Sequence, residues 1–246
     1  MTERTSVAEN ASRQGQLLAW SVHLFTASGV VLALLALDAI ERGQWKEALL
    51  WLFVALAVDG VDGSMARAVR IKERVPRIDG DVLDLVIDYL GFVLLPALLI
   101  WRADFLPPPV AFPLAALILV SALYNFARRD MKTDDGYFRG FPALWNIVAF
   151  YFVVAPPDPA VAAGVVVALA ALTFAPVHFV HPFRVSDYGR WLPALALLWG
   201  VTTVALLLPG LSTEVAKALL AISLAAAAML AALGLLRTLR GPRARL

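Results

Sequence analysis

The strongest constraint on the fold is a series of long apolar segments that runs through almost the whole chain. Eight stretches are apolar enough to be candidates for the roughly 20-residue helix that crosses the hydrocarbon core of a bilayer, although the fifth is short. Short connections with turn-forming residues, such as Pro209-Gly210, separate them. The sequence therefore predicts an all-α integral membrane protein with about eight transmembrane helices. The predicted spans lie near residues 17–40, 46–66, 81–101, 110–127, 141–155, 159–180, 191–208 and 215–236.

The overall composition agrees with lipid as the solvent of this chain. Hydrophobic residues make up 61% of the 246 residues and charged residues only 16%, whereas soluble domains carry about 45–50% and about 25%. No long hydrophilic stretch is left for a second, soluble unit, so we expect a single transmembrane domain over residues 1–246. The absence of cysteine excludes disulfides and thiolate chemistry.

The lysines and arginines predict how the chain is oriented. With eight spans, both termini lie on the same side of the membrane, and all but four of the 21 basic residues fall in segments on that side. Cytoplasmic loops are enriched in lysine and arginine, so we expect both termini in the cytoplasm. Because the basic residues follow the membrane, we expect no nucleic-acid partner. The four exceptions are Arg42, Lys46, Arg102 and Lys217.

Four aspartates interrupt the second and third apolar segments, where ionisable side chains are costly and usually face a cavity or a partner. Asp59 and Asp62 lie in one segment, and Asp84 and Asp88 lie in the next. Helical positions three and four residues apart share a face. Because one short cytoplasmic loop joins the two segments, both pairs lie at the same membrane depth. We therefore expect the four carboxylates to converge near the cytoplasmic surface.

Converging carboxylates repel one another in a low dielectric, and divalent cations relieve that repulsion. Oxygen ligands with no histidine or cysteine nearby in the sequence suit Mg²⁺ or Mn²⁺. Such ions usually share their coordination shell with substrate phosphates, and a pair of ions can clamp both oxygens of a displacement. We therefore expect one or two ions, held by Asp59, Asp62, Asp84 and Asp88.

Two glycines and an arginine accompany the aspartates at the same helical spacing. Gly63 and Gly80 leave room for close approach of a helix or a diphosphate, and Arg67 can offer a bidentate fork to a phosphate. The alternative is that the aspartates only cap helix ends or pair with loop arginines. Four aspartates in register with these three residues argue against that alternative.

This motif resembles the signature of the CDP-alcohol phosphatidyltransferase family, Asp-x2-Asp-Gly-x2-Ala-Arg, a spacer, then Gly-x3-Asp-x3-Asp. The spacer, residues 68–79, is longer than is usual for the family and favours a particular branch. Residues 22–29 and residues 132–146, with their Gly-Phe-Pro and Trp-Asn, are similar to a bacterial branch that makes phosphatidylcholine. The resemblance extends to about residue 184. The fixed positions of the signature are Asp59, Asp62, Gly63, Ala66, Arg67, Gly80, Asp84 and Asp88.

The resemblance implies a six-helix core over about residues 15–184 and two additional helices over about residues 190–240. It implies a metal-dependent phosphotransferase that moves the phosphatidyl group of CDP-diacylglycerol to choline and releases CMP. Asp88 would also be the base for the choline hydroxyl. The family further implies a homodimer in the bacterial inner membrane, with its site on the cytoplasmic side. The residues implied to contact CDP and its phosphates are Gly63, Ala66, Arg67 and Gly80.

Choline has no N–H donor, so aromatic faces are its natural ligands, each contributing about 0.5–2 kcal/mol. Aromatic residues gather near the cytoplasmic ends of the fourth and fifth predicted helices. The alternative interpretation of each is an aromatic belt at the membrane interface. The candidate choline ligands are Tyr124, Tyr137, Phe141 and Trp145.

Two other functions compete with this interpretation. The same chemistry with serine, inositol or glycerol phosphate as acceptor would require a carboxylate partner for serine or extra basic residues for a phosphate. A cation transporter would need charges near the midplane on several helices, preferably with repeat symmetry. Here the aspartates lie on one helix pair and no repeat is visible. A purely structural membrane protein would give no reason to tolerate them.

Overall fold

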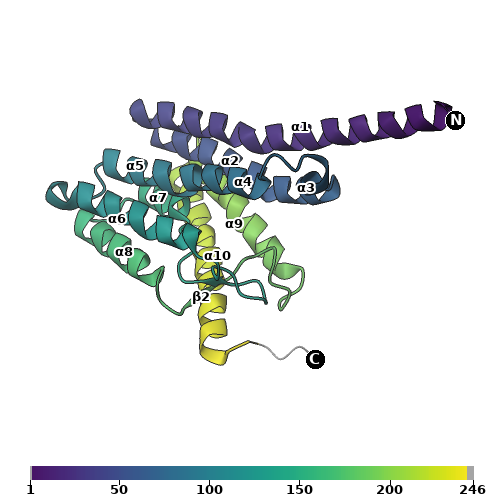
Figure 1. Cartoon of the computed structure of the whole chain (residues 1–246). Helices are drawn as coiled ribbons and strands as arrows, with labels where there is room; N and C mark the ends of the chain where they lie inside the picture. The colour runs from purple at the N-terminus through teal and green to yellow at the C-terminus, as the bar shows by residue number, and fades with distance from the viewer. Residues whose placement is uncertain (1, 243–246) are drawn as a thin grey trace.

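The apolar segments form a bundle of helices in the computed structural model of the chain (Figure 1), which describes residues 2–242 and the side chains of residues 13–242. Of the basic residues assigned to the cytoplasmic side, Arg4, Arg243 and Arg245 have side chains outside this range. The helices are α1 (Thr2–Glu41), α2 (Trp45–Ala68), α3 (Ile71–Arg74), α4 (Gly80–Tyr89), the π-helical turn η1 (Leu90–Leu94), α5 (Leu95–Arg102), α6 (Pro108–Ala127), α7 (Trp145–Val154), α8 (Pro159–Leu172), α9 (Trp191–Leu207) and α10 (Thr213–Arg240).

Each predicted span contains an apolar helix, and the prediction of an all-α membrane protein is confirmed. Five helical stretches in the described part of the chain are long and apolar enough to cross a membrane, and α7, α8 and α9 are shorter apolar helices. The third span is continuous, because α4, η1 and α5 follow one another without a break. The five long stretches are Arg13–Glu41, Trp45–Ala68, Gly80–Arg102, Pro108–Ala127 and Thr213–Arg240.

The fifth and sixth helices are shorter than the sequence predicts. The predicted span 141–155 begins only at Trp145, and the predicted span 159–180 ends at Leu172. Gly140 explains both differences. Its φ of +78° is left-handed, and a Cβ at this position would collide with the carbonyl oxygen of Thr173. The backbone before α7 therefore passes directly against the backbone at the end of α8. Helices extended through Gly140 and Thr173 would not leave room for this close approach.

The chain between α6 and α7, residues 128–144, forms a structure that we call the strap. It folds back on itself, because Thr133 N–H donates to the Tyr137 carbonyl (2.8 Å) and Arg139 N–H donates to the Met131 carbonyl (2.9 Å). It contains β1 (Phe138–Arg139), which pairs antiparallel with β2 (His178–Phe179) from the segment after α8. The sequence does not predict this two-stranded pairing.

The core lies where α2, η1 and α7 meet. Leu49 and Leu52 of α2, Val93 of η1, and Trp145 and Phe150 of α7 are all buried. Lipid offers little hydrophobic drive for helix association, so van der Waals packing of this kind holds membrane helices together. The packing places α4 against α1 (Figure 1). Residues of α2 and α4 line the same pocket, and this arrangement positions the candidate site.

Candidate metal centre

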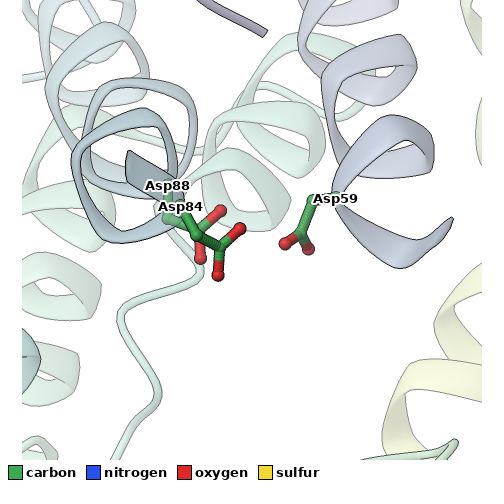
Figure 2. Close-up of side chains that lie close together, drawn as sticks. All are labelled: Asp59, Asp84 and Asp88. Carbon is green, nitrogen blue, oxygen red and sulfur yellow. The ribbon is translucent and has the colours of Figure 1, made fainter. Parts of the chain in front are cut away.

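Three of the four predicted metal ligands come together in space. Asp59 on α2, and Asp84 and Asp88 one turn apart on α4, each offer a carboxylate oxygen, and these oxygens lie within 4.8 Å of one another. Figure 2 shows Asp84 and Asp88 on one helix with Asp59 facing them from the other. The helical spacing in the sequence therefore correctly indicates a shared face. We call these three residues the aspartate cluster.

Asp79 determines where α4 begins, and hence which way its aspartates point. The Asp79 side chain accepts hydrogen bonds from the backbone N–H groups of Asp81 (3.0 Å) and Val82 (3.2 Å), an N-cap of the helix. With the helix starting at Gly80, Asp84 lies about one turn inside it. Asp81 faces away and forms an exposed ion pair with Lys72 (2.6 Å). Asp79, Asp81 and Asp84 are close in sequence, and yet each has a different environment.

Asp62, the fourth predicted ligand, is buried and lines the same pocket as the cluster, but it is not one of the three residues whose oxygens converge. The pocket is formed by α1, α2, α4 and the turn η1. A carboxylate at its wall adds negative charge to a site that already holds three. Asp62 therefore remains a predicted ligand whose side chain lies beside the cluster.

The donor set fits a hard divalent cation. All three converging groups are carboxylates, and Mg²⁺ and Mn²⁺ prefer oxygen ligands. Three carboxylates at this separation repel one another strongly when shielded from water. A cation bound between them removes that repulsion, so the cluster can hold a metal ion.

The predicted CDP-binding residues lie in the C-terminal part of α2 and at the first residue of α4, on the two helices that carry the cluster. The exposed Arg67 guanidinium donates to the Ser64 hydroxyl (3.0 Å). A Cβ on Gly63 would touch Arg67, and one on Gly80 would touch the His23 ring, each at 3.4 Å. Ala66 packs against a small apolar cluster that joins α1, α2 and α3. Gly63 therefore lies next to Arg67, and Gly80 lies next to His23 of α1, while the role of these residues in binding CDP stays a prediction.

The first helix supplies pocket residues that the sequence analysis did not assign to the site. Thr26 and Gly29 of α1 line the pocket together with the aspartates. His23, one turn before Thr26, is buried, and its Nε2 has no hydrogen-bond partner among the described residues. A polar stripe at a spacing of three residues inside an apolar helix is the sequence signal that could have found them.

Lys132 of the strap is the other side chain that the sequence analysis missed. Its ammonium lies 5.4 Å from the centre of the Phe138 ring, and His181 stacks on the same ring at 5.3 Å. Partial desolvation, and then the positive charge of Arg184, lower the pKa of Lys132. The carboxylates of the aspartate cluster act in the opposite direction. Lys132 is therefore within electrostatic reach of the cluster, although its sequence position suggested only a cytoplasmic loop.

The four predicted choline ligands do not form a common aromatic box. Tyr124 is exposed on α6 and contacts Phe174. Tyr137 is buried, and its hydroxyl donates to Asp187 (3.2 Å). Phe141 and Trp145 are buried against each other, with ring centres 5.2 Å apart. None of the four lines the pocket at the aspartate cluster.

Comparison with known proteins defines the class. Residues 19–177 match the family model described as CDP-alcohol phosphatidyltransferase. This stretch holds the aspartate cluster and every fixed position of the motif. The chain belongs to this family and is a membrane-embedded transferase.

Relatives with assigned names point to one branch of the family. A phosphatidylcholine synthase from Pseudomonas aeruginosa is 49% identical over 187 residues, which cover 75% of this chain and 78% of that protein. One from Bradyrhizobium diazoefficiens is 46% identical over 189 residues, covering 76% and 70%. One from Borreliella burgdorferi is 31% identical over 202 residues, covering 82% and 86%.

Proposed function

We propose that the protein is a phosphatidylcholine synthase, which transfers the phosphatidyl group of CDP-diacylglycerol to choline and releases CMP. The observation that carries this proposal is the convergence of Asp59, Asp84 and Asp88 in a chain of this family. The choline acceptor is supported by similarity to proteins named phosphatidylcholine synthase from several bacteria.

The reaction is a displacement at phosphorus. The choline hydroxyl oxygen attacks the phosphorus that carries the diacylglycerol, the bond from that phosphorus to the bridging oxygen breaks, and CMP leaves with the bridging oxygen. The hydroxyl proton passes to a carboxylate, which we assign to Asp88. Asp59, Asp62, Asp84 and Asp88 would hold the metal ion or ions, and Arg67 would bind a phosphate oxygen. A bound ion supplies positive charge where negative charge develops on the phosphoryl oxygens.

We propose Mn²⁺ or Mg²⁺ as the ion, in one or two copies, because the ligands are all carboxylates. The cytidine would lie near Gly63 and Ala66, with Gly80 leaving room for the diphosphate. The acceptor subsite would draw on the aromatic residues of α6, the strap and α7, namely Tyr124, Tyr137, Phe141 and Trp145.

The proposed setting is the bacterial inner membrane, with both termini and the site facing the cytoplasm, where choline and CMP are dissolved. The whole chain, residues 1–246, would act as one catalytic domain, with the family core over about 15–184 and additional helices over about 190–240. We also propose a homodimer, as the family implies. Cross-linking of the purified protein in lipid nanodiscs would reveal a monomer if the dimer proposal is wrong.

The acceptor is tested by measuring CMP release from CDP-diacylglycerol by purified protein with Mn²⁺, in separate reactions with choline, serine, inositol and glycerol phosphate. We expect release with choline alone. Release with another acceptor would keep the transferase and overturn the choline proposal. Absence of release with all four, together with metal-dependent uptake of a cation into proteoliposomes, would favour a transporter instead.

A further inference from the structure

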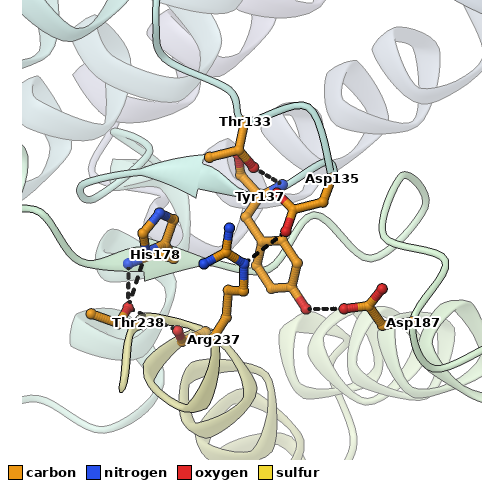
Figure 3. A network of polar contacts seen from close by, with 8 residues as sticks. Thr133, Asp135, Tyr137, His178, Asp187, Arg237 and Thr238 are labelled. Atoms are coloured by element: carbon orange, nitrogen blue, oxygen red, sulfur yellow. Dashed lines mark hydrogen bonds and ion pairs between the residues drawn. The ribbon is translucent and has the colours of Figure 1, made fainter. Parts of the chain in front are cut away.

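The last helix, α10, is attached to the strap by a group of polar contacts (Figure 3). Arg237 forms an ion pair with Asp135, in which Arg237 Nε lies 2.7 Å from Asp135 Oδ2. The two side chains are only 10% and 23% exposed, unlike the ion pair between Lys217 and Glu214 at the other end of the same helix, which is 68% and 83% exposed. Because shielding from water strengthens a charge pair that is already formed, the Arg237 contact constrains the strap more than a surface pair would.

A second pair of contacts extends the attachment on either side of this ion pair. The Arg237 guanidinium lies 5.6 Å from the centre of the Tyr137 ring, and the buried Tyr137 hydroxyl donates to Asp187. Within the strap, the Thr133 hydroxyl accepts from Tyr137 N–H (3.0 Å). The tip of the strap, between Thr133 and Tyr137, is thus held from both sides.

The neighbouring strand β2 is attached to α10 as well. His178 N–H donates to the Thr238 hydroxyl (2.8 Å), and that hydroxyl donates to the Gly234 carbonyl (3.0 Å). A Cβ on Gly234 would collide with the His178 carbonyl oxygen, so a glycine is needed for the strand to lie against the helix. Since β2 pairs with β1, α10 supports the strap through its strand as well as through Arg237.

The strap in turn carries Lys132, a cation within electrostatic reach of all three residues of the aspartate cluster. Lys132 immediately precedes Thr133, and a β-bridge joins Lys132 to Phe138 across the strap. The Lys132 ammonium lies over the Phe138 ring. A shift of the strap tip would therefore move Lys132 relative to the cluster.

We propose that Arg237 is a positioning residue, whose ion pair with Asp135 ties α10 to the strap and thereby holds Lys132 beside the aspartate cluster. In that place Lys132 would offer a positive charge to the diphosphate, the anionic part of the substrate. Arg237 does not line the pocket at the aspartate cluster and would act only through the strap. The residues that match the family model end at 177, so this support comes from a part of the chain outside that match.

The test combines kinetics with a direct measure of strap motion. Asp134 is exposed at the strap tip, and the natural chain contains no cysteine, so Asp134→Cys provides a single site for a nitroxide spin label. We expect Arg237→Gln and Asp135→Asn each to increase the mobility of the label and to lower kcat/KM for CDP-diacylglycerol by roughly 10- to 100-fold, because misplacing a group by about 1 Å can cost about 100-fold. Arg237→Lys, which keeps the charge, should recover much of the activity.

Two comparisons separate positioning from a purely structural role. The double variant Asp135→Asn/Arg237→Gln should be no worse than either single variant, since both remove the same contact. Lys217→Gln, which breaks the exposed pair on the same helix, should change neither kcat/KM nor label mobility. Kinetic constants are normalised to folded protein, measured by size-exclusion chromatography.

The proposal is overturned if Arg237→Gln lowers only the amount of folded protein, with the label spectrum and kcat/KM per folded molecule unchanged. The kinetic readout rests on the proposed function, but the spin-label readout needs no substrate. If the wild-type protein uses an acceptor other than choline, the choline proposal fails, and the same variants are then compared with that acceptor.

Discussion

At the scale of single residues, the environment of each aspartate decides what it does. Asp79 caps α4, Asp81 forms an exposed ion pair, and Asp84 and Asp88 point at Asp59. These four aspartates belong to one short helix: Asp79 is its N-cap, and the other three lie within it. Their distinct surroundings provide matched controls for the metal site.

Asp84→Asn is expected to abolish metal-dependent transfer, whereas Asp81→Asn is expected to retain activity within about twofold. Substituting residues that only orient a metal ligand already costs about 10- to 100-fold, so loss of a ligand should cost at least about 100-fold. An exposed ion pair contributes little. The two variants are compared by their transfer activity and by their Mn²⁺ binding, which electron paramagnetic resonance measures. Equal losses in the two variants would contradict the metal centre.

His181 gives a prediction about pH. Desolvation by burial, with smaller contributions from Arg184 and Lys132, lowers the pKa of His181 to about 4, whereas it is about 6.5 in an unfolded chain. Between these values the unfolded chain binds more protons, so stability is lost as the pH falls from about 6.5 towards 4. His181→Phe keeps the stacking on Phe138 and removes this titration. Its unfolding temperature in detergent should fall less steeply over this range, and an unchanged slope would refute the assignment.

At the scale of elements, periodicity predicts the helices well and the strap poorly. The aspartate stripes follow from the spacing of three and four residues, which is a local property of one helix pair. The electrostatic effect of the cluster on Lys132 depends instead on the fold of the strap, in which β1 pairs with β2, 40 residues further along the chain. Strands of two residues leave no periodic pattern, so sequence reasoning could not bring Lys132 within electrostatic reach of the cluster.

The same limit applies to the predicted choline ligands. Tyr137, Phe141 and Trp145 are aromatic residues close in sequence, which suggests a shared box. In the structure, Tyr137 turns towards α10 and Asp187, whereas Phe141 and Trp145 enter the core. Left-handed Gly140 separates the two groups by turning the chain between them. Aromatic composition alone carries no information about this turn.

The approach of α10 to β2 can be tested with two glycines. Gly234→Ala should destabilise the protein by about 1–3 kcal/mol, because its Cβ meets the His178 carbonyl oxygen and one backbone must move. Gly200→Ala, on the neighbouring helix α9, meets nothing within 4 Å and should be neutral or stabilising by up to about 1 kcal/mol. Thermal unfolding in detergent compares them. Equal unfolding temperatures would contradict the close approach.

At the scale of the whole molecule, the four basic residues outside the predicted cytoplasmic side gather at one end of the bundle. Lys46 in the first turn of α2 donates to the Leu206 carbonyl near the end of α9 (3.2 Å). Arg102 at the end of α5 lines a surface hollow with residues of the turn between α1 and α2. The aspartate cluster and the strap lie towards the opposite ends of these helices. The uneven distribution of lysine and arginine along the sequence therefore corresponds to two opposite ends of the helix bundle.

Single cysteines would test the orientation that we propose. In intact bacterial cells, Asp104→Cys, after α5, should react with a membrane-impermeant maleimide, and Asp134→Cys, in the strap, should react only after the membrane is permeabilised. Both side chains are exposed, and the natural chain has no competing cysteine. The reverse pattern of labelling would place the site on the outer side.

The central claim is that the aspartate cluster transfers a phosphatidyl group to choline. The most direct measurement is the formation of labelled phosphatidylcholine from isotopically labelled choline and CDP-diacylglycerol by purified protein, with and without EDTA. We predict product with Mn²⁺ or Mg²⁺, none with EDTA, and none with Asp88→Asn. Labelled phosphatidylcholine formed equally well by Asp88→Asn, or in the presence of EDTA, would contradict the account.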